Sequence, residues 1–173
     1  LISNACNFPK SNSLSEVNSK KWENDLKINL TSHHIIFKES VPYLKLGIQS
    51  SITFVGSRNV LAPGPGAGTY TIAKSGLTQM SRLAAIELAK HGIRVNIIHP
   101  DCVFDTKIWN KSVLKERADE YGLSIEKYKK KNLLKTSVSS SDVANLIEFL
   151  ASKKSSKITG SQIPIDGGNL RVI

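Results

Sequence analysis

The sequence of 173 residues predicts an α/β fold built on a doubly wound parallel sheet. Two short apolar runs, at 51–56 and 94–99, lack the polar alternation of a half-exposed strand and are typical of strands buried on both faces. Longer stretches with helical spacing separate such runs, so strands and helices alternate along the chain. The length fits one domain. In such sheets, ligands bind at the carboxyl ends of the strands.

The first part of the chain is expected to hold two strands and one helix. Residues 1–5 (LISNA) resemble the inside of a buried strand, and residues 7–17 are polar and loop-like. Apolar residues recur at helical spacing over 22–46, although Pro42 should bend or end that helix. The apolar run at 51–56 is the second strand.

The second part continues the alternation. A loop rich in Gly and Pro, residues 62–68, precedes an Ala- and Leu-rich helix at 69–90 that Gly92 should end. Pro100 should end the strand at 94–99. The remaining expected elements, in chain order, are one or two exposed helices within 108–132, a helix at 141–152 with Asp142 in its first turn, and a last strand at 162–165.

Composition narrows the classes of protein. The net charge of +10 requires that nucleic-acid binding be weighed. The lysine clusters at 127–131 and 153–157 lack interleaved aromatic residues, apart from Tyr128, and are interpreted as solvated surface. No apolar run is long enough to span a membrane. Cys6 and Cys102, which are too few for a disulfide framework, indicate reduced thiols in a cytoplasmic protein. No metal site is predicted.

A tyrosine and a lysine four residues apart begin the helix at 69–90. This spacing puts Tyr70 and Lys74 on one helix face, about one turn apart. A phenol with its ordinary pKa of about 10 is a weak base, whereas a nearby ammonium and the positive helix N-terminus favour phenolate. Ser57 directly follows a buried strand, so its hydroxyl could donate to a substrate oxygen held by Tyr70. The spacing alone also fits a surface pair.

The order Ser57, Tyr70, Lys74 resembles the active site of the short-chain dehydrogenase/reductase family. Further motifs of that family are matched in the same order along nearly the whole chain. They are Ser3-Asn4-Ala5-Cys6, Trp22 with Asn29-Leu30-Thr31, Gly92-Ile93-Arg94-Val95-Asn96 followed by Pro100, Thr159-Gly160, and Asp166-Gly167-Gly168.

The resemblance implies a Rossmann-like fold in which residues 1–173 are the C-terminal part of one NAD(P)-binding domain, without the family's first three strands. It implies hydride transfer between NAD or NADP and a carbonyl or alcohol carbon, with 108–132 as the substrate loop. The implied catalytic residues are Tyr70 as acid/base, Lys74 as modulator of its pKa and ribose ligand, Ser57 to polarise the substrate oxygen, and Asn29 to hold a water. The implied cofactor-binding residues are Asn4, Ala5, Tyr70, Lys74, Pro100, Val103 and Thr106.

Residues 58–66, 99–109 and 166–173 resemble one branch more narrowly, the dehydrogenase half of bifunctional aldolase/short-chain dehydrogenases of the rhamnulose-1-phosphate aldolase/lactaldehyde dehydrogenase type. This branch implies a small hydroxyaldehyde or sugar-derived alcohol as substrate and an aldolase module upstream. The sequence departs from the family at Cys6 and Asp101, where glycine is usual. It contains neither the Gly-rich phosphate loop nor the residue that selects NAD or NADP, so the cofactor choice stays open.

The resemblance also implies a homo-oligomer, a dimer or tetramer, formed through the helices at 22–46 and 69–90. Because about half of the dinucleotide site is expected upstream, the 173 residues alone are expected to be inactive. The alternative to an enzyme is a non-catalytic remnant or structural subunit of the same fold.

Overall fold

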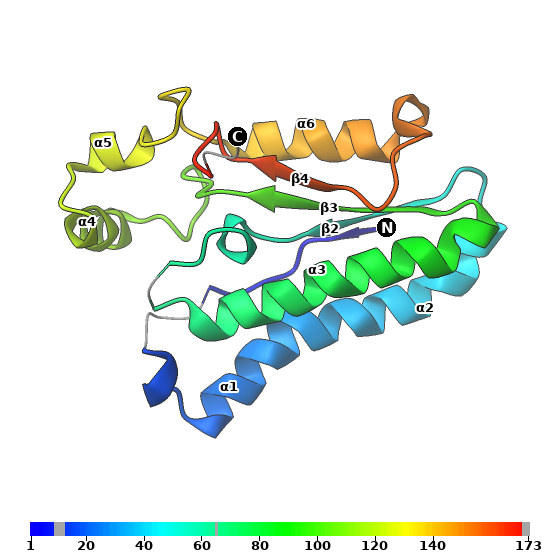
Figure 1. Cartoon of the computed structure of the whole chain (residues 1–173), viewed down its shortest axis with the longest axis horizontal. Coiled ribbons are helices and arrows are strands. Elements are labelled where there is room, and N and C mark those ends of the chain that lie inside the picture. The colour runs from blue at the N-terminus through cyan, green and yellow to red at the C-terminus, as the bar shows by residue number, and fades with distance from the viewer. Residues whose placement is uncertain (9–12, 65, 171–173) are drawn as a thin grey trace.

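The computed structural model describes residues 1–8, 13–64 and 66–170, so the expected features at 9–12, 65 and 171–173 lie outside the described residues. One parallel sheet holds four strands in the spatial order β1-β2-β3-β4 (Figure 1). The strands are β1 (Ile2–Ser3), β2 (Ser51–Val55), β3 (Arg94–Pro100) and β4 (Gln162–Ile165). The expected parallel α/β sheet is therefore confirmed.

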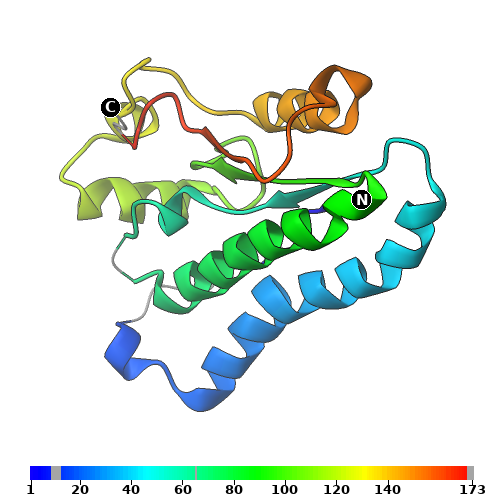
Figure 2. The same ribbon diagram turned by 45° about the vertical axis from the view of Figure 1, so that its right-hand side comes forward.

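Helices cover the sheet on both faces. α1 (Ser19–Leu26), α2 (Ser32–Leu46) and α3 (Gly68–Leu88) lie on one face, and α6 (Ser140–Ala151) lies on the other (Figures 1 and 2). The apolar residues of β2 and β3 pack toward one or the other of these layers, as expected for strands buried on both faces. The core under α2 and α3 is centred on Ile52, Phe54, Leu77, Val95 and Ile97, and the core under α6 on Val55, Ile98 and Leu150.

The helix expected at 22–46 begins earlier and has an irregular centre. Asn18 caps α1 by accepting a hydrogen bond from the Lys21 N–H at 2.9 Å. A π-helical turn, Lys27–Thr31, joins α1 to α2. Pro42 does not end the helix, because α2 continues to Leu46. Pro42 has no N–H to donate to the Lys38 carbonyl. Both residues are exposed, so water can hydrogen-bond to that carbonyl instead.

α3 agrees closely with the expected helix. It continues through a 3₁₀ turn, Ala89–His91, and ends at Gly92, which adopts the left-handed conformation with φ 68°. Glycine reaches this conformation at little cost, so Gly92 is the expected helix stop. In the register Val55 pairs with Ile98, and Pro100 pairs with Ile165, so the carboxyl ends of β2, β3 and β4 lie along one edge.

The segment 108–132 extends beyond that edge as two short helices, α4 (Lys111–Glu120) and α5 (Ile125–Lys129) (Figure 1). They are less exposed than expected, because Leu114, Ala118 and Tyr128 are buried. No helix within the described ranges is long and apolar enough to cross a membrane.

Candidate active site

A cavity of about 470 Å³ opens at the carboxyl ends of β2 and β3. Its walls come from the loop after β1, the start of α3 and the α4–α5 segment. Ser57, Tyr70 and Lys74 all line this cavity. The structure therefore brings the three expected catalytic residues together, as expected for a site at the strand ends of a parallel sheet.

Ser57 lies two residues past the end of β2, in extended backbone with φ −162°. Its side-chain oxygen accepts a hydrogen bond from the Asn59 N–H at 3.2 Å and so caps a 3₁₀ turn, Arg58–Val60. The oxygen is used here as an acceptor, so the hydroxyl proton remains available to a ligand in the cavity.

His99 contacts the backbone of Ser57, and sequence reasoning did not identify this residue. Its ring is fully buried, with Nδ1 3.2 Å from the Ser57 backbone N and Nε2 3.3 Å from the Gln162 Oε1. Burial lowers the His99 pKa, which favours the neutral ring. Nδ1 also lies 3.1 Å from the Ser57 carbonyl oxygen, so the tautomer decides its role: Nδ1 accepts from the Ser57 N–H when the proton is on Nε2, and donates to the Ser57 carbonyl when the proton is on Nδ1. The available signal was a polar ring at the end of an apolar strand.

Tyr70 lies in the first turn of α3 and is only 8% exposed. The Phe8 ring packs edge-on against it, with the ring centroids 4.9 Å apart. Burial raises the Tyr70 pKa above its ordinary value, and Cys6 adds to this, whereas the Ser57 hydroxyl acts in the opposite direction. The phenol is therefore neutral in this structure, and the expected stabilisation of phenolate is not seen.

The Lys74 ammonium lies beside the Tyr70 ring and is held by the sheet. It donates to the Val55 carbonyl at 2.8 Å, and it lies 5.8 Å from the centroid of the Tyr70 ring. The side chain is 1% exposed, and burial lowers the Lys74 pKa to about 8. A lysine with this pKa can lose its proton close to neutral pH, which makes it a candidate for proton exchange.

Asn29 lies in the π-helical turn and is fully buried. Its amide nitrogen donates to the Asn7 Oδ1 at 2.7 Å and to the Asp25 carbonyl at 3.1 Å. Its oxygen accepts from the Asn7 N–H at 3.2 Å. Asn29 therefore holds the loop after β1 and is not part of the cavity wall. Its expected role in holding a water stays a prediction.

A buried carboxylate that sequence reasoning missed joins α1 to the start of α3. Asp25 accepts a hydrogen bond from the Thr69 hydroxyl at 2.6 Å and pairs with Lys21 at 2.9 Å. Thr69 directly precedes Tyr70, so this contact fixes where the tyrosine enters the cavity.

Most of the expected cofactor-binding residues line the same cavity. Asn4 lies on the β1 side, and Pro100, Val103 and Thr106 lie at and beyond the end of β3. Ala5 is exposed and is not part of the wall. The expected cofactor-binding residues therefore line the cavity, with the exception of Ala5.

The far wall is aromatic. Trp109, Tyr121 and Tyr128 line the cavity, and Phe104 contacts Trp109 with ring centroids 5.0 Å apart. The Lys131 ammonium stacks over Tyr121 at 4.4 Å and over Tyr128 at 4.8 Å. The interpretation of the 127–131 cluster as solvated is therefore wrong for Lys131, because the two rings partly remove its charge from water.

Comparison with known proteins agrees with this geometry. A family model described as Enoyl-(Acyl carrier protein) reductase matches residues 1–169. The chain is 32% identical to the uncharacterized oxidoreductase YuxG of Bacillus subtilis and 29% identical to the human dehydrogenase/reductase SDR family member 4, over 97% of its length in both cases.

Solved structures are also similar. A short chain dehydrogenase family protein from Francisella tularensis is 30% identical, with a TM-score of 0.84 over 99% of this chain and 70% of that one. Carveol dehydrogenase from Mycobacterium avium in complex with NAD is 28% identical, with a TM-score of 0.88 over 99% of this chain and 64% of that one.

The chain spans 25% of YuxG and 58% of the human relative. Within that span the family model, the parallel sheet and the gathered Ser57, Tyr70 and Lys74 agree. The chain belongs to the short-chain dehydrogenase/reductase family.

Proposed function

We propose that this protein catalyses reversible hydride transfer between NAD or NADP and a small hydroxyaldehyde or sugar-derived alcohol or carbonyl. The observation that carries the proposal is the convergence of Ser57, Tyr70 and Lys74 on one cavity at the strand ends. Tyr70 gives a proton to, or takes one from, the substrate oxygen. Ser57 donates its hydroxyl proton to the same oxygen, orienting and polarising it.

Lys74 serves Tyr70 in two ways in this proposal. Its ammonium has three donors, of which the Val55 carbonyl occupies one, so others remain for ribose hydroxyls. Bound there, nicotinamide supplies the site that takes up or releases the hydride. Binding would also bring polar groups to a phenol and an ammonium that are now desolvated, which favours their charged forms. Asn4, Val103 and Thr106 are placed to line the nicotinamide side.

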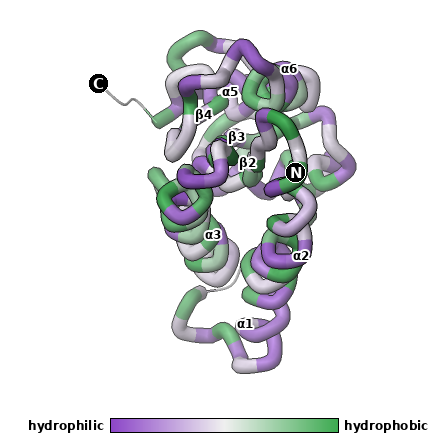
Figure 3. The backbone as a smooth tube through the Cα atoms, turned by 90° about the vertical axis from the view of Figure 1, so that its right-hand side faces the viewer, coloured by the Kyte–Doolittle hydropathy of each residue, from purple (hydrophilic) through white to green (hydrophobic). Residues whose placement is uncertain are grey.

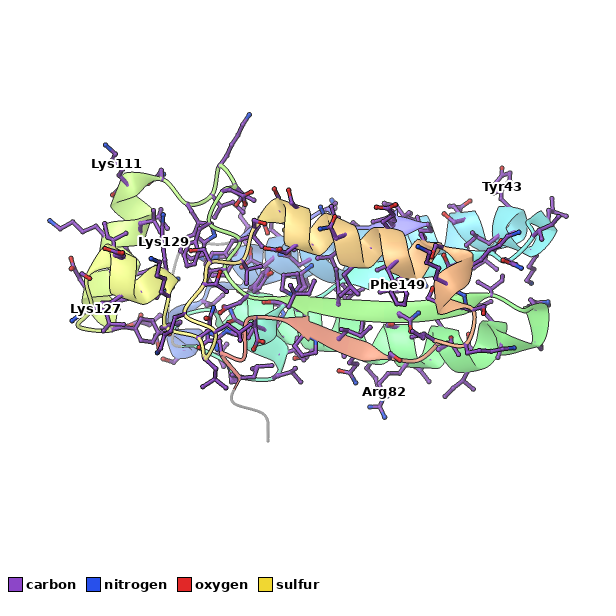
Figure 4. All side chains as sticks on the ribbon, turned by 90° about the horizontal axis from the view of Figure 1, so that it is seen from above. Tyr43, Arg82, Lys111, Lys127, Lys129 and Phe149 are labelled. Atoms are coloured by element: carbon purple, nitrogen blue, oxygen red, sulfur yellow. The ribbon has the colours of Figure 1, made fainter. Side chains whose placement is uncertain are left out.

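The decisive experiment replaces Tyr70 by Phe in the full-length protein. The ring and its packing against Phe8 are kept, and only the ionisable oxygen is lost, so folding should survive. Loss of a general acid/base lowers the turnover number about a hundredfold or more. Tyr43→Phe is the matched control, because Tyr43 is 76% exposed on α2, at the end of the molecule away from α4 and α5 (Figure 4). Near-parental turnover of Tyr70→Phe would favour the alternative of a structural subunit.

The substrate class and the fusion to an aldolase module rest on the narrower sequence resemblance. One observation supports the fusion. The aligned region is only a quarter of YuxG, whereas it is more than half of the human relative, so YuxG is long enough for further modules. The coding sequence upstream of Leu1 tests this directly, since a dinucleotide-binding half preceded by an aldolase sequence is expected.

A homo-oligomer is supported by exposed apolar side chains on α2 and α3, which lie side by side under the sheet (Figure 3). They are Ile35, Ile36 and Leu46 on α2 and Ile72, Leu83 and Ile86 on α3. Such a surface is typical of a subunit interface. Light scattering should find a dimer or tetramer, and a monomer at micromolar concentration would contradict this.

The 173 residues alone are proposed to bind NAD or NADP weakly and to lack activity. Within the described residues β1 pairs only with β2 and so presents a free parallel edge. The sequence contains no Gly-rich phosphate loop, which normally holds the pyrophosphate. Tight, saturable NAD binding by this chain in calorimetry would contradict the proposal.

A further inference from the structure

A fixed arginine follows the catalytic serine. The Arg58 Nε lies 2.9 Å from the Asp101 Oδ1, and both side chains are nearly buried. The other Asp101 oxygen accepts a hydrogen bond from the Asn169 amide, and the Asp101 backbone N–H donates to the Ile165 carbonyl at 3.0 Å. Asp101 is therefore held to β4 and in turn fixes Arg58. Among the described residues Asp101 is the one side chain that pairs with the Arg58 guanidinium, and it does so through Nε, so the terminal nitrogens remain available at the cavity wall.

A second cation lies behind the aromatic wall: Lys131 is not itself a lining residue of the cavity, but the two rings that it contacts, Tyr121 and Tyr128, are. The Lys131 ammonium stacks over Tyr121 and Tyr128, and no carboxylate of the described chain lies within 4.0 Å of it. It is close enough to Asp101 and Arg58 for both charges to affect its pKa, although burial has the larger effect and lowers it. Arg58 pairs with Asp101, whereas Lys131 pairs with no carboxylate of the described chain, so the three side chains together carry a net positive charge.

Cys102 links this cationic group to the catalytic tyrosine. Its thiol feels the charges of Asp101, Lys131 and Arg58, and it also influences Tyr70. Burial raises the Cys102 pKa to about 12, so the thiol is neutral and adds no negative charge. Arg58 directly follows Ser57 in the sequence, and Arg58, Cys102 and Tyr70 all line the same cavity, so an anion at the guanidinium and an oxygen at Tyr70 would share one space.

We propose that Arg58 and Lys131 form a subsite for a carboxylate or phosphate group, so that the substrate is a small anionic hydroxy or carbonyl compound. This inference rests on the proposed hydride transfer and narrows its substrate class. The substrate oxygen lies at Ser57 and Tyr70, and the anionic group lies between the Arg58 guanidinium and the Lys131 ammonium. Arginine suits this role because its planar donors match the geometry of both anions.

The test compares matched alcohols with the full-length protein and saturating NAD. Lactate is compared with propane-1,2-diol, and glycerol 3-phosphate with glycerol, so that the two arms separate carboxylate from phosphate recognition. In at least one of the two pairs, the anionic alcohol should have a kcat/KM at least about tenfold higher than that of its neutral counterpart. Arg58→Met and Lys131→Met should each reduce that preference about tenfold or more. Lys127→Met is the matched control, because this exposed lysine projects away from the cavity (Figure 4), and it should keep the preference.

Calorimetric binding of lactate and glycerol 3-phosphate separates this inference from the proposed function. Binding that Lys131→Met and Arg58→Met abolish, without hydride transfer, would support the subsite and refute the dehydrogenase. Turnover of the neutral alcohols with no anionic preference would overturn the subsite and leave the dehydrogenase standing. Arg58→Lys guards against misfolding at the Asp101 pair, since it keeps the charge and should retain part of the preference. A preference for the anionic alcohols that Arg58→Met, Arg58→Lys and Lys131→Met all leave unchanged would also overturn the subsite.

Discussion

The two walls of the cavity are built in different ways. The catalytic wall comes from β2, β3 and α3, where backbone groups hold the polar side chains. His99 contacts the Ser57 backbone, and Lys74 donates to a strand carbonyl. The opposite wall comes from residues 108–132, where aromatic rings contact one another and lysines stack on them.

In the proposed function the two walls have different roles: the first holds the proposed catalytic groups, and the second would select the substrate. Tyr70 and Lys74 are 8% and 1% exposed, whereas Ile108 and Tyr121 on the far wall are each 45% exposed. Moving a catalytic group would disturb the sheet, but the aromatic wall can change with little effect on the core. The fold therefore constrains the reaction more tightly than it constrains the substrate, as expected for sites grafted onto a common scaffold.

The largest expected effect is that of Lys74→Met on catalysis. Without the ammonium, Tyr70 loses a nearby positive charge in the loaded enzyme, and the cofactor loses a ribose ligand. We expect kcat/KM to fall about a hundredfold, the rising limb of its pH profile to move to higher pH, and cofactor affinity to fall with it. A substitution in the far wall, Tyr121→Leu, should change KM and leave the pH profile in place. An unchanged profile and affinity in Lys74→Met would refute the role of the lysine.

The same variant should show how strongly the catalytic wall is desolvated. Folding lowers the Lys74 pKa from 10.5 to about 8, so between these values the unfolded state binds more protons and the parent gains stability as pH rises. Below pH 8 the parent carries the full cost of a buried ammonium. Lys74→Met does not carry this cost, so any stability advantage of the variant is largest below pH 8. Between pH 8 and 10.5 the difference in the free energy of unfolding between variant and parent should shrink by up to about 3 kcal/mol, at about 1.4 kcal/mol per pKa unit. Denaturant titrations at several pH values measure this, and parallel curves for the two proteins would contradict it.

A pair of glycines compares packing in the two walls. A Cβ at Gly56 would lie 2.6 Å from the His99 Nδ1 and 3.0 Å from the Ile98 carbonyl oxygen, whereas at Gly64 the nearest such atom is the Tyr121 Oη at 3.7 Å. Gly56→Ala should therefore lower the free energy of unfolding by about 1–3 kcal/mol and reduce turnover by displacing Ser57. Gly64→Ala should do neither. Equal effects in thermal unfolding would show that the two walls are packed alike.

Periodicity was enough to predict the sheet and its helices, because buried strands and amphipathic helices have characteristic apolar patterns. The helix also continues past Pro42 to Leu46, as the apolar spacing indicated, because an exposed carbonyl tolerates the proline that was expected to bend or end it. The π-helical turn at Asn29 had no pattern that could predict it, since it alters hydrogen bonding without changing the apolar face.

The convergence of Ser57, Tyr70 and Lys74 on one cavity was predictable because each lies at a strand end or a helix start, and their catalytic roles stay predictions. Contacts between distant segments escaped prediction. His99 and Asp25 act through residues 42 and 44 positions away, and nothing in the local sequence indicates those partners. The solvated interpretation of Lys131 failed for a different reason: its partners Tyr121 and Tyr128 are near in sequence, but the fold of the segment brings both rings against its ammonium.

The smallest expected effects come from removing one helix cap in each region. Ser139 caps α6 by accepting from the Asp142 N–H at 3.2 Å, and the Asp142 carboxylate accepts from the Ser139 N–H at 2.8 Å. Asn110 caps α4 by accepting from the Val113 N–H at 3.0 Å. Either cap contributes about 1 kcal/mol to its helix.

The location of the helix should decide where that loss is felt. α6 covers the sheet through the fully buried Leu150, so Ser139→Ala should lower the free energy of global unfolding by about 1 kcal/mol. Because Val143 and Ile147 of α6 also line the cavity, any change in KM should accompany this global loss. α4 is remote from the sheet, so Asn110→Ala should instead raise local opening of α4 and the KM for substrate about two- to fivefold. Amide hydrogen exchange distinguishes the cases: faster exchange confined to α4 in Asn110→Ala is expected, whereas an equal loss of protection in β3 would mean that the substrate wall and the sheet unfold as one unit.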